Sequence, residues 1–285
     1  MESLAPSLPV ELYWNIVRWV KSKRDLGTLC RVSRAMRADA ERALYRSCIA
    51  CTKPSDVQHL LHICSHLGKA WQVDELELDL YIFEPNQTVI QTALRSMVNL
   101  RSLTVLGGWR SDVNLTNLLK GVTVRLHHLI LATTIPPESN TAIKHFFLKQ
   151  SYSLHELDLT RCEGPISILR DVPFQNLRVL ATKSVDGMFV DILKRGQIEC
   201  LSCKGELLDK VDRVLLSMRS LSLYGAFPRV FEGKFPHLIH LQVDVVCVIW
   251  SLGVVANPTH SSLRLHFDRG QSENFWISSL HSGSC

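Results

Sequence analysis

The chain has 285 residues, of which 46% are apolar and 21% charged, and its formal net charge is +5. A chain of this length and apolar content can bury a sizeable core, which argues against intrinsic disorder and favours one elongated domain or two units. The first fifty residues hold nine Lys and Arg against five Asp and Glu, which leaves 23 against 22 in the other 235. This near neutrality argues against a general nucleic-acid-binding surface on the larger part, because such a surface needs a basic stripe. We interpret the basic residues of the first fifty as a solvated helix face.

Residues 8–47 contain three short apolar series with helical spacing. Pro9 fits the first turn of a helix, where its missing N–H costs nothing. The first series recurs at four-residue intervals and consists of Leu8, Leu12, Ile16 and Val20. After the polar break 21–25, the second series consists of Leu26, Leu29, Val32 and Met36, and the third ends at Leu44 and Tyr45. We expect these apolar faces to be buried against a neighbouring surface.

Residues 51–72 are predicted to form a connecting helix that starts near Ser55 and Asp56, two residue types that cap helix N-termini. Beyond them, residues 73–285 repeat the pattern Leu-x-x-Leu-x-Leu at intervals of 20 to 28 residues. The fourth position of the pattern falls at Leu76, Leu103, Leu129, Leu157, Leu180, Leu201, Leu221, Leu241 and Leu263. Periods of this length with this core are typical of leucine-rich repeats.

The segments between the repeated cores predict the rest of each unit. Residues 86–97, 114–120, 140–149, 185–195 and 207–217 have the apolar spacing of helices. A strand followed by a helix or loop at such a short period builds a solenoid, with parallel strands on the concave side and helices on the convex side. The alternative is an ordinary α/β domain with parallel, leucine-rich strands. We expect Phe275, Trp276 and Ile277 to cap the last repeat.

Strand geometry locates a candidate binding surface. Side chains alternate across a strand, so the fourth and sixth positions of a repeat should point into the core, and the third, fifth and seventh toward the concave side. Charged and aromatic residues near those concave positions are candidate contacts for a target protein: Glu75, Glu77, Asp79, Glu156, Asp158, Lys183, Lys204, Tyr224, His240 and Arg264. They run from acidic to mixed or basic along the chain, which suits a partner with a basic patch at one end. Scattered solvated charges are the alternative.

Some cysteines have metal-like spacing. They are Cys48 with Cys51, Cys200 with Cys203, and Cys64 beside His59, His62 and His66. Cys200 and Cys203 occupy a third and a sixth repeat position, so on a strand they should point to opposite faces and cannot easily share a metal. Pro54 and a helix cap separate the first pair from the histidines. We therefore predict no metal site and no other cofactor.

The sequence offers no catalytic motif: it has no glycine-rich phosphate loop, no Gly-x-Ser-x-Gly elbow and no His-Glu-x-x-His helix. We therefore predict that the chain is not an enzyme. The longest uncharged apolar run, 245–256, has twelve residues and is too short to span a bilayer, so no membrane partner is expected. Nine cysteines without a signal-peptide pattern indicate reduced thiols, and hence the cytoplasm or the nucleus.

Taken together, residues 8–47 resemble an F-box. The positions that carry the resemblance are Leu8-Pro9, Leu12, Ile16, Asp25-Leu26, Leu29-Cys30, Val32-Ser33 and Leu44-Tyr45. F-boxes are three-helix modules that bind the Skp adaptor of cullin–RING ubiquitin ligases. The resemblance therefore implies a substrate receptor that binds Skp and, through it, cullin. Met36 stands where the family usually has a tryptophan.

The resemblance and the repeat pattern together predict a layout for this α/β chain: an F-box-like helical domain at 1–50, a connecting helix at 51–72, and a leucine-rich-repeat domain of about nine units at 73–285. The implied adaptor contacts are Leu8, Pro9, Leu12, Ile16, Leu26, Leu29, Val32, Met36 and Leu44. The implied function is recognition of a target protein within a Skp–cullin–F-box E3 ubiquitin ligase. Two alternatives stay open: a leucine-rich-repeat interaction scaffold outside any ligase, and a nucleic-acid-associated protein that uses the basic first fifty residues.

Overall fold

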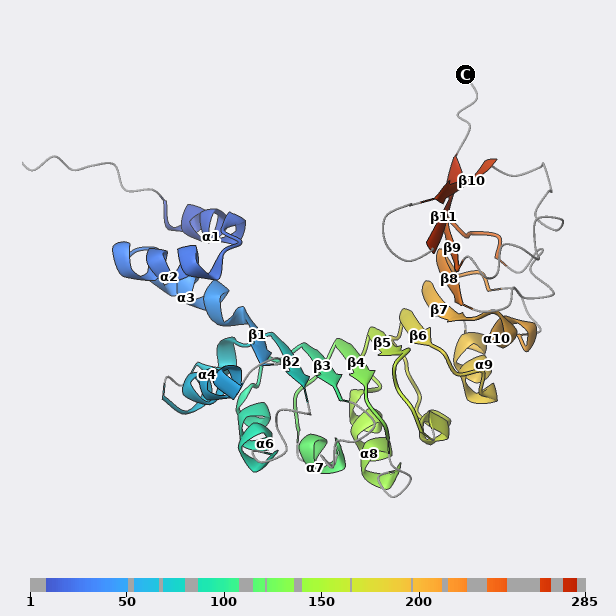
Figure 1. Cartoon of the computed structure of the whole chain (residues 1–285), viewed down its shortest axis with the longest axis horizontal. Helices are drawn as coiled ribbons and strands as arrows, with labels where there is room; N and C mark the ends of the chain where they lie inside the picture. Colours follow the sequence, from blue (N-terminus) through green and yellow to red (C-terminus); the bar gives the residue numbers. More distant parts are fainter. Residues whose placement is uncertain are drawn as a thin grey trace, which may run out of the picture.

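In the part of the chain that the structure describes, eleven strands form one open, curved sheet with the order β1-β2-β3-β4-β5-β6-β7-β8-β9-β11-β10 (Figure 1). The computed structural model describes residues 9–50, 54–66, 69–79, 87–107, 115–120, 122–135, 140–164, 166–195, 197–211, 215–224, 235–244, 262–267 and 274–280. The fold is therefore α/β with an open and largely parallel sheet, and the prediction is confirmed at this level.

Three short helices precede the sheet: α1 (Val10–Trp19), α2 (Lys23–Val32) and α3 (Arg37–Arg46). We call them the helical module. Helix α3 packs against both of the others. The buried core of the module is small and consists of Val17, Leu26 and Ala40, each at most 4% exposed.

The boundaries of α2 differ from those that the apolar spacing predicts. The Ser22 side chain accepts a hydrogen bond from the Asp25 N–H (3.3 Å), so α2 starts inside the polar break. Ser33 adopts an extended backbone conformation that ends α2, and its Oγ accepts a hydrogen bond from the Met36 N–H (3.2 Å). Met36 therefore lies in the turn before α3 and is not the last member of the α2 apolar series.

Strands β1 to β9 are parallel, and each pairs with the next along the chain. They are β1 (Ser47–Ala50), β2 (Glu75–Asp79), β3 (Ser102–Leu106), β4 (His128–Ala132), β5 (Glu156–Leu159), β6 (Val179–Thr182), β7 (Cys200–Lys204), β8 (Ser220–Tyr224) and β9 (His240–Asp244). From β2 to β9 the register aligns the fourth repeat positions, so Leu76 through Leu241 form one row in which each leucine is at most 3% exposed. The predicted alternation of buried and outward side chains is confirmed.

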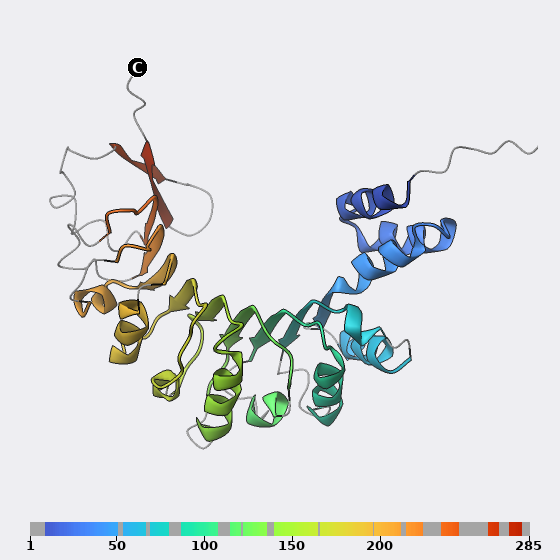
Figure 2. The same ribbon diagram turned by 180° about the vertical axis from the view of Figure 1, so that it is seen from behind.

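Helices and short 3₁₀ turns occupy the connections on the convex side of the sheet (Figure 2). They are α4 (Pro54–His66), η1 (Ala70–Gln72), α6 (Gln87–Ser96), α7 (Leu115–Leu119), α8 (Asn140–Gln150), η4 (Ile166–Leu169), α9 (Gly187–Lys194) and α10 (Gly205–Asp209). Four of the five predicted helices lie close to their predicted bounds. The helix predicted at 207–217 is wrong for the described residues beyond Asp209, which are not helical. The repeat that starts at β7 is short, and this leaves room for only a brief helix.

The sheet starts earlier in the chain than the sequence predicts. Strand β1 pairs in parallel with β2, with Ser47 opposite Glu75 and Ala50 opposite Leu78. These residues fall within the segment 1–50, for which the sequence predicts a helical domain, so that prediction is wrong for Ser47–Ala50. Because α3 ends at Arg46 and β1 starts at Ser47, the helix runs directly into the first strand.

At the other end, the ninth predicted repeat does not extend the parallel stack. Strand β11 (Asn274–Leu280) pairs antiparallel with β9, and β10 (Ser262–Phe267), which holds Leu263, pairs antiparallel with β11. The prediction of a parallel ninth strand beside β9 is therefore wrong. Six residues link β10 to β11, and so short a connection permits only an antiparallel pair. Phe275, Trp276 and Ile277, the predicted cap, lie in β11 and are paired with β9.

A buried glutamine fixes the irregular backbone before β4. Gln150 is 1% exposed, its Oε1 accepts a hydrogen bond from the Leu126 N–H (2.9 Å), and its Nε2 donates to the Val124 carbonyl oxygen (2.8 Å). Residues 122–126 are not part of a strand, so their buried polar groups need partners from elsewhere. Gln150, the last residue of α8, thus supplies hydrogen bonds to the backbone of the segment that leads into β4.

Gly164 provides a test of the contact between two neighbouring connections. Its φ is +107°, and a Cβ added there would lie 2.3 Å from the Ile135 carbonyl oxygen. We predict that Gly164→Ala lowers the free energy of unfolding by about 1–3 kcal/mol, because a side chain is strained at this φ and clashes with backbone. Urea denaturation followed by circular dichroism measures this change.

The matched control is Gly27→Ala in α2, where an added Cβ meets nothing within 4 Å. Because alanine favours a helix more than glycine does, this variant should gain up to about 1 kcal/mol. Equal stability of Gly164→Ala and the unmodified chain would contradict the prediction.

Candidate protein-interaction surfaces

Helix α1 presents an apolar face to solvent. Leu12 is 41% exposed, Ile16 38% and Trp19 82%, and their spacing of four and three residues places them on one side of the helix. The opposite side carries Val17, which is fully buried in the core of the helical module. On α2, Val32 is 72% exposed. Exposed apolar side chains at helical spacing mark a surface that another protein can cover.

The structure divides the predicted adaptor contacts into two groups. Pro9, Leu12, Ile16 and Val32 are exposed. Leu26 is buried in the core of the helical module, Leu29 and Leu44 pack against this core from partly buried positions, and Met36 is partly buried in the turn before α3. Leu8 lies outside the described residues. The inward group holds the three helices together, so only the outward group is available to a partner in this conformation.

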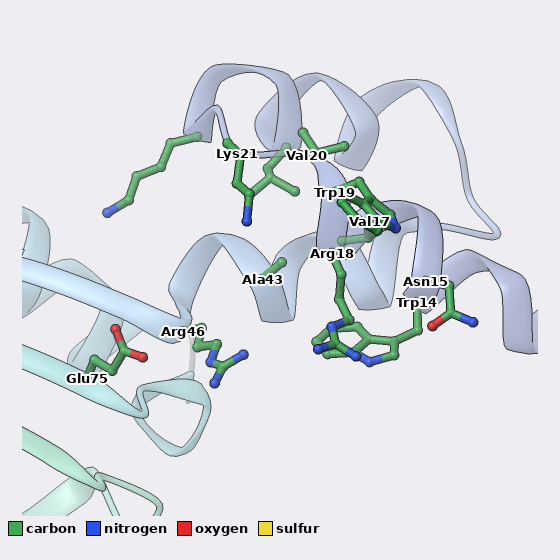
Figure 3. Close-up of a pocket in the computed structure, with 12 residues that line it drawn as sticks. Trp14, Asn15, Val17, Arg18, Trp19, Val20, Lys21, Ala43, Arg46 and Glu75 are labelled. Atoms are coloured by element: carbon green, nitrogen blue, oxygen red, sulfur yellow. The ribbon is translucent and has the colours of Figure 1, made fainter. Parts of the chain in front are cut away.

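Two cavities lie where the helical module meets the sheet, and we call them together the junction cleft. The larger, of about 820 Å³, is lined by Trp14, Asn15, Val17, Arg18, Trp19, Val20, Lys21, Lys23, Leu26, Ala43, Arg46 and Glu75. The smaller, of about 280 Å³, is lined by Trp14, Arg42, Arg46, Trp71, Gln72, Asp74, Asn99 and Arg101. Figure 3 shows Lys21, which follows α1, Arg46 at the end of α3, and Glu75 on β2. The sequence alone does not reveal this cleft, because its residues come from several separate elements and the spacing of the basic ones indicates only a solvated helix face.

Ion pairs fasten the helical module to the sheet. Arg46 Nε lies 3.3 Å from Asp74 Oδ2, and Lys69 Nζ lies 2.8 Å from Glu41 Oε2. The Lys69 ammonium also lies 4.8 Å from the centre of the Tyr45 ring. Hydrogen bonds from Lys69 and Arg37 lower the pKa of Glu41, so this carboxylate stays charged. Of these contacts, the Arg46–Asp74 pair joins two residues that line the junction cleft itself.

The concave face is a sheet surface with the predicted residues spread over several strands. On β2, Glu75 is exposed, whereas Glu77 and Asp79 are partly buried. Glu156 and Asp158 lie on β5, and β3 and β4 separate them from β2, a distance of about 14 Å at normal strand spacing. The structure therefore does not bring the acidic residues together into one cluster.

Several of these side chains are engaged with neighbours. Glu156 Oε2 lies 2.8 Å from His128 Nδ1 on β4. Asp158 Oδ1 accepts hydrogen bonds from the N–H (2.8 Å) and the hydroxyl (2.7 Å) of Thr160. Such contacts fix the orientation of both carboxylates on the concave side.

The remaining predicted contacts lie toward the C-terminal half. The Tyr224 hydroxyl lies 2.5 Å from Ser202 Oγ on the adjacent strand. Lys204 ends β7 and is partly buried, Lys183 follows β6 and is exposed, and His240 is exposed on β9. Arg264 lies on β10, which β11 separates from β9, and its side chain is outside the described residues.

A further row of side chains lies at the second repeat position, just before each strand. The backbone joins its members in sequence, because the N–H of each donates to the carbonyl of the one before: Arg101, His127, His155, Arg178, Glu199, Arg219 and Ile239. The His127 and His155 rings stack with centres 5.0 Å apart, and Arg178 pairs with Glu199 at 3.0 Å. The prediction of a binding surface covers only the third, fifth and seventh positions and omits this row. Its members could have been found in the sequence, because each lies two residues before the leucine in the fourth position of its repeat.

The second pair of cysteines has the geometry predicted for it. Cys203 is fully buried, while Cys200 is partly exposed on the concave side. Burial raises the pKa of the Cys203 thiol to about 12, and burial with the nearby Glu199 and Glu156 raises that of Cys200. Metals bind thiolates, so neither group favours ligation. Among the described residues, which exclude Cys51, no three His, Cys, Asp or Glu side chains gather as ligands for a metal ion.

No known protein-family model matches the chain, and no curated protein matches it by sequence. Within the described residues, which do not include the apolar run 245–256, no helix is both long and apolar enough to cross a membrane.

His127 makes the stability of this sheet sensitive to acid. Burial lowers its pKa below the ordinary value of 6.5, and the positive charges of His155, Arg101 and His128 lower it further. The unfolded chain therefore binds a proton at higher pH than the folded chain does. We predict that the free energy of unfolding falls as the pH decreases below about 6.5, until the folded-state pKa is passed.

The measurement is urea denaturation at a series of pH values between 7.5 and 5. His127→Gln should show a smaller loss of stability than the unmodified chain over this range. His145→Gln, which removes an exposed histidine on α8, is the control and should keep the full loss. An identical pH dependence for His127→Gln and His145→Gln would contradict the assignment.

Proposed function

We propose that this chain is the substrate-recognition subunit of a Skp–cullin–F-box E3 ubiquitin ligase in the cytoplasm or nucleus. In this proposal the helical module is an F-box that binds the Skp adaptor, and through it cullin. The strands and their convex connections are leucine-rich repeats that form a solenoid and bind the target protein on the concave side. The chain itself performs no catalysis, and its contribution is to hold the target near the ligase.

The observation that carries the proposal is the outward apolar face of α1. Leu12 and Ile16 match the F-box pattern and are exposed, while Leu26, Leu29 and Leu44 from the same pattern hold the helices together. A helix that keeps Leu12, Ile16 and Trp19 in solvent has an unfavourable surface until a partner covers it. The open sheet beside the module supplies a separate surface, so one chain can hold two proteins at once.

The test is capture of purified Skp adaptor by the full chain. We predict that Leu12→Asp combined with Ile16→Asp weakens capture by roughly 100-fold or more, because each apolar anchor contributes about 1–3 kcal/mol and a buried carboxylate adds a desolvation cost. Both positions are exposed, so the fold should survive, and circular dichroism checks this.

The matched control is Ala38→Asp, which adds a negative charge at an exposed position in the first turn of α3, away from the outward face of α1. It should bind the adaptor as the unmodified chain does. If the unmodified chain captures no adaptor, the ligase proposal fails and the scaffold alternative takes its place. If the double variant binds as well as the control, the adaptor does not use this face.

A further inference from the structure

The junction cleft is strongly basic, although the larger part of the chain is nearly neutral. Six cationic side chains line it: Arg18, Lys21, Lys23, Arg42, Arg46 and Arg101. Two carboxylates line it as well, Asp74 and Glu75, which leaves a net charge of +4. Cations held this close together repel one another, and an anion that enters the cleft relieves the repulsion.

Two of the arginines are well placed to receive such an anion. The Arg42 guanidinium carbon lies 5.7 Å from the centre of the Trp14 ring, which is a cation–π contact. Such a contact attracts the guanidinium group but leaves its positive charge uncompensated. Arg101 approaches the same small cavity from the segment before β3. Among the described ion pairs, Asp74 is paired with Arg46, and no pair includes Arg42 or Arg101. The planar fork of N–H donors on a guanidinium group can bind two oxygens of a carboxylate or of a phosphate at once.

The shape of the cleft suits a side chain and the backbone that bears it. Its smaller part has about 280 Å³ and also contains Trp71, which is 48% exposed. Exposed tryptophan beside arginine is the composition of protein-binding sites that anchor a few residues. The larger part, of about 820 Å³, is lined mainly by residues of the helical module and leaves room for the rest of the ligand.

The charges next to the cleft decide between a peptide and a nucleic acid. Strand β2 leads away from the cleft along the concave face and presents Glu75, Glu77 and Asp79 in turn. Alternate residues on one face of a strand lie about 7 Å apart, so this row of carboxylates spans about 14 Å. A phosphate backbone that leaves the cleft over β2 is repelled at every step. A peptide can change its sign along its sequence and is attracted by both regions.

The geometry points to a binding site for a peptide segment whose acidic side chain enters the junction cleft and whose basic residues lie a few positions away, over β2. This inference deepens the proposed function, on which it rests for the idea that the ligand belongs to a target protein. The acidic group is a carboxylate or a phosphate on the peptide, since both suit Arg42 and Arg101.

The experiment measures the binding of fluorescently labelled peptides to the full chain by anisotropy. One probe carries two glutamates followed closely by two lysines, a second carries the same residues with the charges interleaved, and a third has phosphoserine in place of glutamate. We expect the first or third to bind tighter than the second. Preference for the third assigns the site to phosphate, and equal binding of the first and third assigns it to carboxylate.

The decisive variant is Arg42→Glu with Arg101→Glu, and its matched control is Arg31→Glu with Arg34→Glu, which reverses two exposed charges elsewhere in the helical module. The first pair should weaken peptide binding roughly tenfold or more, and the second by less than about twofold. Equal losses for both pairs, or no binding of any peptide, would overturn the inference. Tighter binding of a single-stranded oligonucleotide, lost in the Arg42 and Arg101 variant, would also overturn it in favour of nucleic acid.

Adaptor capture by the same variants separates this inference from the proposed function. Arg42→Glu with Arg101→Glu should keep adaptor capture, because these residues line the cleft and not the outward face of α1. Leu12→Asp with Ile16→Asp should keep peptide binding. If the unmodified chain binds the peptide but captures no adaptor, the result supports peptide binding in the junction cleft and contradicts the ligase proposal. If it captures the adaptor but binds no peptide, the result supports the ligase proposal and contradicts peptide binding in the cleft.

Discussion

Each layer of this molecule depends on the layer beside it, because one strand with its connection has too little apolar surface to bury alone. The row of leucines from Leu76 to Leu241 is the contact through which the layers stabilise one another. Full burial of one such side chain is worth about 1.5–3 kcal/mol, so the row is a large part of the folding energy. The register that aligns the leucines also sends every other side chain to the concave face. The packing and the candidate interaction surface are thus two results of one alternation.

An open stack of parallel strands has two edge strands, and the unpaired backbone groups of an edge strand can pair with another chain. At one side the stack begins with β1, which continues directly from α3. At the other side β11 takes the hydrogen bonds that a further parallel strand would make with β9. The two ends therefore differ in kind: one carries a helical module with an apolar outward face, and the other a reversal of strand direction.

The parts of the fold that depend on local spacing could be predicted from the sequence. The fourth-position leucines recur within short windows, and their burial follows from the strand period alone. Strand β1 could not be found in this way, because Ser47–Ala50 lacks the leucine pattern and is a strand only through its pairing with β2. Spacing also did not show that Leu26 faces inward while Val32 on the same helix is exposed. The junction cleft was out of reach, since Trp14, Arg42 and Arg101 come from separate elements.

No linker separates the helical module from the sheet, and the ion pairs of Arg46 with Asp74 and Lys69 with Glu41 cross their boundary. The helical module therefore has little freedom to rotate relative to the sheet, unlike a domain that is joined by a flexible linker. The outward face of α1 is therefore held at a fixed distance and orientation relative to the concave face of the sheet. Adding or removing one strand with its connection would change the distance from the helical module to the strands beyond it by about 4.8 Å, the spacing of neighbouring strands. In such a molecule the number of strands in the sheet sets how far the last strands lie from the helical module.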